Sequence, residues 1–222
     1  MQLEQNHKLL FVGDSITDCN RSRPFGEGLS DALGTGYVAL VNALIQVRHP
    51  SLPIRVVNMG VSGNTVRDLK ARWQSDVLDL TPDWLSIMIG INDVWRQYDS
   101  PSMPETHVGL KEYEDTLADL VLRSQNVCQG ILILSPFFIE PRRDDPMRHT
   151  EDQYRQAAHT IAHQQGCQYV DMQAPFDELL RYKNSAELSW DRVHPNLTGH
   201  LLIATTMMDA LERSAPQPSV GV

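Results

Sequence analysis

Four short, continuously apolar segments constrain the fold of this chain more than any other feature. They are rich in Val, Ile and Leu, and each ends in glycine, proline or a polar residue. Continuous apolar character is typical of strands that are covered on both faces, as in a parallel sheet. The segments are KLLFVGD (8–14), IRVVNMG (54–60), WLSIMIG (84–90) and GILILSP (130–136), with CQYVD (167–171) as a weaker fifth.

Segments with helical periodicity separate these strands, and apolar residues recur in them at steps of three and four. The alternation predicts an α/β fold, a three-layer α/β/α sandwich with right-handed crossovers and a central parallel sheet of about five strands. The predicted helices span residues 36–49, 65–80, 107–125, 147–166 and 196–213.

Length and composition are those of a globular protein. The chain has 222 residues, of which 41% are hydrophobic and 21% charged. This length fits a single domain spanning 1–222. Only the Pro- and Ser-containing tail, residues 214–222, is expected to be loose.

Charge and hydropathy exclude several classes of partner. The net charge is −9 and no stripe of Lys and Arg interrupts it, so nucleic acid is not an expected partner. No apolar run approaches the roughly 18 to 20 residues of a membrane-spanning helix, so no membrane partner is expected. The N-terminal segment lacks the basic start and long apolar stretch of a secretory signal, which favours a cytoplasmic location. The three cysteines are widely spaced and are expected to be reduced thiols.

Polar residues directly follow three of the predicted strands. They are Gly13-Asp14-Ser15, the segment NMGVSGNT (58–65) and the segment GIND (90–93). Ligands bind at the carboxyl ends of the strands in open α/β sheets, so these residues are candidates for a site. Each of them, taken alone, equally fits an ordinary turn or helix cap.

A fourth polar segment, WDRVHPNLTGH, lies near the C-terminus and places Asp191 three residues before His194. Acyl transfer by a serine needs a hydroxyl, a histidine that takes its proton, a carboxylate that orients the imidazole, and donors for the oxyanion. Ser15, Asn92 and the glycine-rich loop supply the remaining groups. The combination favours a serine esterase over four unrelated turns.

The segments GDSITD, NMGVSGNT, GIND and DRVHP resemble, in order and spacing, the four conserved blocks of the SGNH hydrolases, also called GDSL esterases/lipases, which have a flavodoxin-like fold. Ile16 stands where the GDSL label has Leu. The resemblance implies that Ser15 is the nucleophile, His194 the base and Asp191 its orienting acid. It also implies an oxyanion hole formed by the N–H groups of Ser15 and Gly63 and the side chain of Asn92.

Longer segments, among them GVSGNTVRDLKARWQSDV and IMIGINDVWRQYD, look like the intracellular acetylxylan esterases of this superfamily. That resemblance implies removal of acetyl groups from xylo-oligosaccharides, no metal or other cofactor, and assembly into homo-oligomers. Aromatic faces suit sugar substrates, so Trp95, Tyr98 and Trp190 are expected to contact substrate, together with Asp14.

Two alternatives stay open. The same catalytic groups would serve a lysophospholipase, a thioesterase or a general short-chain arylesterase. A non-catalytic carbohydrate-binding protein on a degenerate hydrolase fold is a different class, and the intact set of Ser15, Gly63, Asn92, Asp191 and His194 argues against it.

Three further segments carry weaker expectations. The connection 24–36 is long for a βα loop and is expected to form a pocket wall or an interface. His159 and His163 are four residues apart but lack a third ligand, so a solvated helix face is expected. The run PRRDDPMRH (141–149) mixes both charge signs and is predicted to be a solvated loop.

Overall fold

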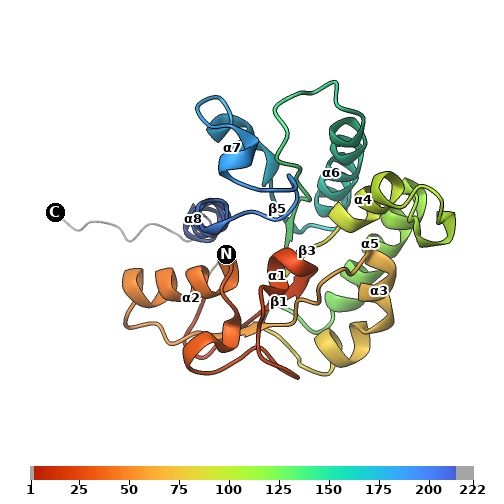
Figure 1. The fold of residues 1–222 in the computed structure, drawn as a ribbon. Coiled ribbons are helices and arrows are strands. Elements are labelled where there is room, and N and C mark those ends of the chain that lie inside the picture. Colours follow the sequence, from red (N-terminus) through yellow and green to blue (C-terminus); the bar gives the residue numbers. More distant parts are fainter. Residues whose placement is uncertain (1–2, 214–222) are drawn as a thin grey trace.

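The computed structural model describes residues 3–213, so the predicted loose tail lies outside the described residues. It contains one five-stranded parallel sheet with the order β2-β1-β3-β4-β5, the order of flavodoxin-like folds. The predicted α/β/α architecture is confirmed (Figure 1). The strands are β1 (Lys8–Gly13), β2 (Arg55–Asn58), β3 (Trp84–Met88), β4 (Gly130–Leu134) and β5 (Gln168–Val170).

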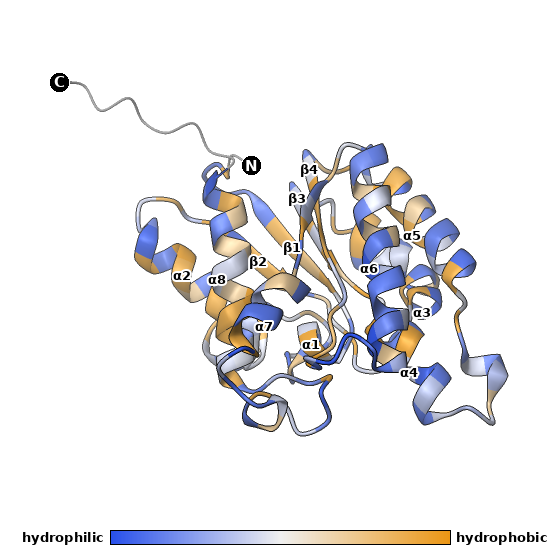
Figure 2. Ribbon diagram, turned by 90° about the horizontal axis from the view of Figure 1, so that it is seen from above, coloured by the Kyte–Doolittle hydropathy of each residue, from blue (hydrophilic) through white to orange (hydrophobic). Residues whose placement is uncertain are grey.

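Helices cover both faces of the sheet. Helices α2 and α8 pack together on one face, and α3, α5 and α6 lie on the other (Figure 1). Apolar residues concentrate on the strands and on the helix faces that meet them (Figure 2). The helices are α1 (Ser15–Asp18), α2 (Tyr37–Arg48), α3 (Val66–Ala71), α4 (Ile91–Asp99), α5 (Leu110–Ser124), α6 (Pro146–Gln164), α7 (Gln173–Leu179) and α8 (Leu197–Arg213).

Strand β1 shows why its sequence is continuously apolar. Its residues Leu9 to Val12 are 0% exposed, because helices cover both faces of the strand. Gly13 pairs with Met88 of β3 in register, so these two strands end side by side. The segments that follow them are therefore brought to one edge of the sheet.

The predicted helix at 65–80 is shorter than expected. Helix α3 begins at a capping box, in which Thr65 accepts the N–H of Asp68, and it ends at Ala71. A π-helical turn then spans Gln74–Leu78. Trp73 lies between the two and is fully buried, and its indole N–H donates to the Ser124 hydroxyl at 3.1 Å.

Short helices follow three of the strands, at positions where the sequence predicted no helix. They are α1 after β1, α4 after β3 and α7 after β5. None exceeds nine residues. Segments of this length carry too few apolar repeats to be separated from polar turns by periodicity. Short 3₁₀ helices also span Ser30–Leu33, Pro104–Thr106 and Ser185–Glu187.

The prediction of a solvated loop at 141–149 is wrong for the end of that run. Helix α6 begins at Pro146, and the Asp145 carboxylate accepts the N–H groups of Met147 and Arg148. The Arg148 side chain is 0% exposed because it binds the Asp177 carboxylate through both terminal nitrogens, at 2.7 and 2.9 Å. A tertiary ion pair therefore overrides the hydrophilic character of the sequence.

Two further observations concern the chain as a whole. Cys19, Cys128 and Cys167 are free thiols, as predicted. Among residues 3–213, no helix combines the length and the apolar composition that crossing a membrane requires.

Candidate active site

Ser15 lies at the junction between β1 and α1, at the carboxyl edge of the sheet. The Asp14 carboxylate accepts the N–H of Ile16 at 3.0 Å and so starts α1 directly after the strand. A Cβ at Gly13 would lie 2.3 Å from the Met88 carbonyl oxygen, so only glycine fits there. The sharp turn leaves the Ser15 side chain half-buried at the edge.

His194 reaches Ser15 from the segment before α8. Its Nε2 lies 2.7 Å from the Ser15 Oγ, and its Nδ1 lies 2.6 Å from an Asp191 carboxylate oxygen. An ionised carboxylate only accepts hydrogen bonds, so the ring proton is assigned to Nδ1 and Nε2 is left to accept from Ser15. The three side chains form the hydrogen-bonded series on which serine hydrolases depend.

Asp191 is held by more than the imidazole. Its second oxygen accepts the N–H groups of Val193 and His194 at 2.9 and 2.8 Å and the Ser189 hydroxyl at 2.9 Å. Burial raises the pKa of Asp191, but the hydrogen bonds from His194 and from these donors outweigh it and lower the pKa below its usual value. The carboxylate is therefore ionised and fixed in orientation.

Gly63 and Asn92 follow the two strands that flank β1, Gly63 in the loop after β2 and Asn92 in the first turn of α4 after β3. The N–H of Val61 donates to the Gly13 carbonyl at 3.0 Å, which fastens the loop to the end of β1. The Asn92 amide donates to the Asn64 carbonyl at 3.0 Å, which fastens the start of α4 to the same loop. Among residues 3–213, the backbone N–H groups of Ser15 and Gly63 donate to no other protein group. Unpaired donors at this edge suit an oxyanion.

Asp93, a buried carboxylate that the sequence did not single out, joins α4 to the start of α3. Asp93 is 0% exposed and accepts the N–H of Val66, at 3.0 and 3.2 Å from its two oxygens. Burial raises the pKa of Asp93 to about 7, and burial likewise raises the pKa of Asp14 to about 6. The only signal for Asp93 was its place directly after Asn92 in the segment GIND.

The residues predicted to contact substrate have different surroundings. The Trp95 ring packs edge-on against the His194 ring, with centroids 5.6 Å apart. Trp190, next to Asp191, is 85% exposed. The Tyr98 hydroxyl instead lies 2.8 Å from the Pro146 carbonyl of α6. Asp14 is 1% exposed and caps α1. Substrate contact by these residues stays a prediction.

A second histidine lies close to the site without sharing its chemistry. His200 Nε2 lies 3.3 Å from the Cys19 Sγ, and its Nδ1 accepts the N–H of Tyr37. Burial raises the pKa of Cys19 to about 12 and lowers the pKa of His200 to about 4. A thiol of this kind is mostly protonated at neutral pH, so the pair is not an activated nucleophile.

Across the part of the chain that the structure describes, no group of three or more His, Cys, Asp or Glu side chains is arranged to hold a metal ion. His159 and His163 are exposed on α6, and the His159 ring packs edge-on against Tyr169.

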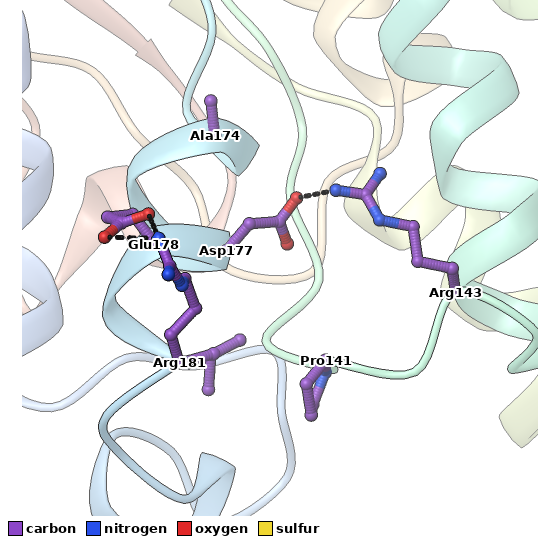
Figure 3. A pocket seen from close by; sticks show the side chains of 7 residues that line it. Pro141, Arg143, Ala174, Asp177, Glu178 and Arg181 are labelled. Atoms are coloured by element: carbon purple, nitrogen blue, oxygen red, sulfur yellow. Dashed lines mark hydrogen bonds and ion pairs between the residues drawn. The ribbon is translucent and has the colours of Figure 1, made fainter.

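An open pocket of about 560 Å³ lies apart from the triad, between α7 and the segment after β4 (Figure 3). Two of the cations that line it are paired with acids, Arg143 with Asp177 and Arg181 with Glu178. Ser15 and His194 both lie outside its lining.

Comparison with known proteins agrees with the geometry of the Ser15 site. The family model for GDSL-like lipases/acylhydrolases matches residues 11–202. The chain belongs to this GDSL-like family. It is therefore a carboxylic ester hydrolase, and the resemblance noted in the sequence is confirmed.

Individual relatives are similar to this chain over nearly its whole length. An acetylxylan esterase of Geobacillus stearothermophilus is 56% identical over 208 residues, which cover 94% of this chain and 95% of that protein. The crystal structure of an acetylxylan esterase from the same organism superposes with a TM-score of 0.94 at 55% identity, covering 95% and 96% of the two chains. An α/β hydrolase from the metagenome of Lake Arreo, Spain, gives a TM-score of 0.93 at 48% identity and covers 96% and 99%.

Proposed function

We propose that this esterase removes acetyl groups from xylo-oligosaccharides. The observation that carries the proposal is the hydrogen-bonded series Ser15–His194–Asp191 at the carboxyl edge of the sheet. The similarity to an acetylxylan esterase across nearly the whole chain supports acetylated xylan fragments as the substrate class.

In the proposed mechanism, the Ser15 Oγ attacks the acetyl carbonyl carbon while His194 Nε2 takes the hydroxyl proton. The tetrahedral intermediate collapses when His194 returns the proton to the sugar oxygen, which leaves as an alcohol. Asp191 stabilises the imidazolium that forms in between. Water then attacks the acetyl-enzyme through the same proton transfers, and acetate is released.

The oxyanion of each tetrahedral intermediate is proposed to accept hydrogen bonds from the N–H groups of Ser15 and Gly63 and from the Asn92 amide. The absence of a protein acceptor for the two N–H groups within residues 3–213 supports this assignment. Only one hydrogen of the Asn92 amide is needed for its bond to Asn64, so the other can face the substrate.

The remaining proposals concern substrate contact and context. Trp95, whose ring packs against His194, and Trp190, which precedes Asp191, are proposed to contact the sugar, together with Tyr98 and Asp14. The single sheet and the family match over 11–202 support one catalytic domain. The three free thiols support a cytoplasmic location. Homo-oligomerisation is an expectation from the family resemblance, and light scattering against the 25.1 kDa chain mass tests it.

Hydrolysis of acetylated xylo-oligosaccharides, followed by mass spectrometry and acetate release, tests the proposed activity. Acetylated pectin fragments and glucose pentaacetate serve as competing substrates, and we expect the xylose compounds to react fastest. A 4-nitrophenyl ester series tests the acyl group. Equal or faster turnover of octanoyl than acetyl esters would contradict the deacetylase and favour a lipase-like enzyme. A serine-directed organophosphate should label Ser15, and failure to label it would favour a non-catalytic binding protein.

A further inference from the structure

Arg72 lies at the C-terminal end of α3 and binds three different segments near the site. Its Nε donates to the Asn64 side-chain oxygen at 2.7 Å, and its Nη1 donates to the Met59 carbonyl at 2.7 Å. Its Nη2 donates to the Gly13 carbonyl at 3.0 Å. The fourth bond, from Nη1 to Asp76 at 2.7 Å, pairs the guanidinium charge.

The contacts with Gly13, Met59 and Asn64 lie within two residues of a proposed oxyanion donor or in the loop that carries one. Gly13 is two residues before Ser15, and its carbonyl also accepts the N–H of Val61. Asn64 directly follows Gly63, and the Asn64 carbonyl accepts the Asn92 amide. The guanidinium therefore contacts the segments that carry the Ser15 and Gly63 donors, and it is connected to Asn92 through Asn64.

The geometry of the contacts favours arginine over other cations. The side chain is 15% exposed, so its hydrogen bonds are shielded from solvent. A guanidinium presents its donors in one rigid plane, whereas a lysine ammonium is a flexible point charge. The Gly63 backbone has φ +82°, a left-handed conformation that glycine adopts freely but does not by itself fix. The contact of Arg72 with the adjacent Asn64 restricts this part of the loop.

We propose that Arg72 is a positioning residue that holds the Ser15, Gly63 and Asn92 donors at the separation the oxyanion requires. The inference rests on the proposed esterase function. Oxyanion stabilisation depends on donors that are fixed before the reaction, and small displacements of catalytic groups cost large factors in rate. Arg72 itself does not touch the substrate in this proposal.

Arg67 provides a matched control on the same helix. It also makes four hydrogen bonds, to the Glu112 carboxylate and to the carbonyls of Glu105 and His107. These contacts lead to α5 and the segment before it, away from the triad. Arg67→Met therefore removes a comparable set of bonds without touching the oxyanion loops.

The test measures kcat and KM for 4-nitrophenyl acetate in wild type, Arg72→Met and Arg67→Met. We expect Arg72→Met to lower kcat by about 10- to 100-fold while KM changes by less than about threefold, since the donors act mainly on the transition state. Arg67→Met should keep kcat within about twofold of wild type. A loss confined to KM, or an equal loss of kcat in both variants, would overturn the proposal.

A double-mutant cycle separates positioning from general destabilisation. If Arg72 acts through the oxyanion donors, Arg72→Met should cost a smaller factor in kcat when Asn92 is already alanine than in wild type, because one of the donors that it positions is gone. The same fold loss in both backgrounds would show that the residues act independently and would overturn the proposal. Arg72→Lys keeps the charge beside Asp76 and replaces Arg72→Met in the cycle should the latter not fold.

The activity of the wild type distinguishes a failure of the esterase function from a failure of the role proposed for Arg72. A wild type that does not hydrolyse 4-nitrophenyl acetate would refute the esterase function and, with it, the role of Arg72. An active wild type with an Arg72→Met variant of equal kcat would refute the role of Arg72 alone.

Discussion

The Ser15 edge and the interface between α6 and α7 are both built from charged groups, but they are built differently. At the edge, Asp191 is ionised and hydrogen-bonded to the ring of His194, whose side chain is 33% exposed. At the interface, Arg148 and Glu151 are both 0% exposed. We call the second region the Arg148 cluster, consisting of Arg148, Glu151, Asp152, Arg155, Asp171 and Asp177.

The comparison of these two regions shows that a shifted carboxyl pKa does not by itself identify a catalytic site. Neither carboxylate oxygen of Glu151 has a hydrogen-bond partner among the described residues, and burial raises its pKa well above the usual value. No serine hydroxyl or histidine ring is bonded to this cluster in the described part of the chain. A strongly shifted pKa therefore reports a buried ionisable group, whereas chemistry also needs a reactive atom in contact with a base and with solvent.

Ser15→Ala is expected to have the largest effect on kcat, because it removes the proposed nucleophile from the Ser15 edge. Removing the nucleophile of a serine hydrolase costs about 10⁴- to 10⁶-fold in kcat, because the acyl-enzyme cannot form. The side chain is half-buried and small, so the free energy of unfolding should stay within about 0.5 kcal/mol of wild type. Turnover of 4-nitrophenyl acetate and urea unfolding measure the two quantities, and wild-type-like turnover would refute the nucleophile.

Arg148→Met tests whether the second region is purely structural. It leaves the Asp177 carboxylate without its main partner, and breaking a buried ion pair costs about 3 to 5 kcal/mol of stability. The kcat of the folded fraction should be unchanged, since the cluster makes no contact with Ser15 or His194. Denaturant unfolding and activity below the unfolding transition measure both. A large loss of kcat in stable protein would show that the two regions are coupled.

Asn92→Ala and Gly63→Ala test whether these two residues donate hydrogen bonds to the oxyanion at the Ser15 edge. Loss of one oxyanion donor costs about 3 to 4 kcal/mol, or about 10² to 10³ in kcat. A Cβ at Gly63 meets no atom within 4 Å, so the alanine fits sterically, but φ +82° is unfavourable for it and the N–H is expected to move. A Gly63→Ala variant with full kcat would exclude this N–H from the oxyanion hole.

Glu151→Gln has the smallest expected effect and tests the sign of the pH dependence. The folded pKa of Glu151 lies above the unfolded value, so the folded state binds the extra proton. Stability is then fully present below the unfolded pKa and falls as pH rises toward the folded pKa, by at most about 1.4 kcal/mol per pH unit. Glutamine mimics the protonated acid, so the variant should match wild type at pH 4 and exceed it above neutral pH. Thermal unfolding against pH measures this.

Asp191 provides the opposite sign within the same protein. Its folded pKa is lowered, so its contribution to stability is present above the unfolded pKa and is lost as pH falls through the folded pKa. Asp191→Asn should therefore flatten the acid side of the stability profile, whereas Glu151→Gln flattens the alkaline side. Matching slopes in the two variants would contradict this comparison.

The sequence by itself determined the sheet and the identity of the candidate groups. Strands buried on both faces must be continuously apolar, and the five predicted segments all contain the observed strands. Ser15, Gly63, Asn92, Asp191 and His194 were recognisable because each follows a strand or precedes a helix within a specific motif. Each segment taken alone also fits an ordinary turn, and the roles of these residues were assigned from the combination of the four motifs and from the family that they resemble.

The burial of individual charged residues could be seen only in the tertiary structure. Arg148 and Glu151 belong to a segment that looks hydrophilic, and Arg148 is buried against partners from α7 and from the segment after β4. The roles inferred for Asp93 and Arg72 have the same origin, because their contacts join loops that lie far apart in the sequence. Hydrogen bonds between distant segments leave no periodic signal, so the positions of the donors around Ser15 became visible only when the sheet brought its carboxyl ends together.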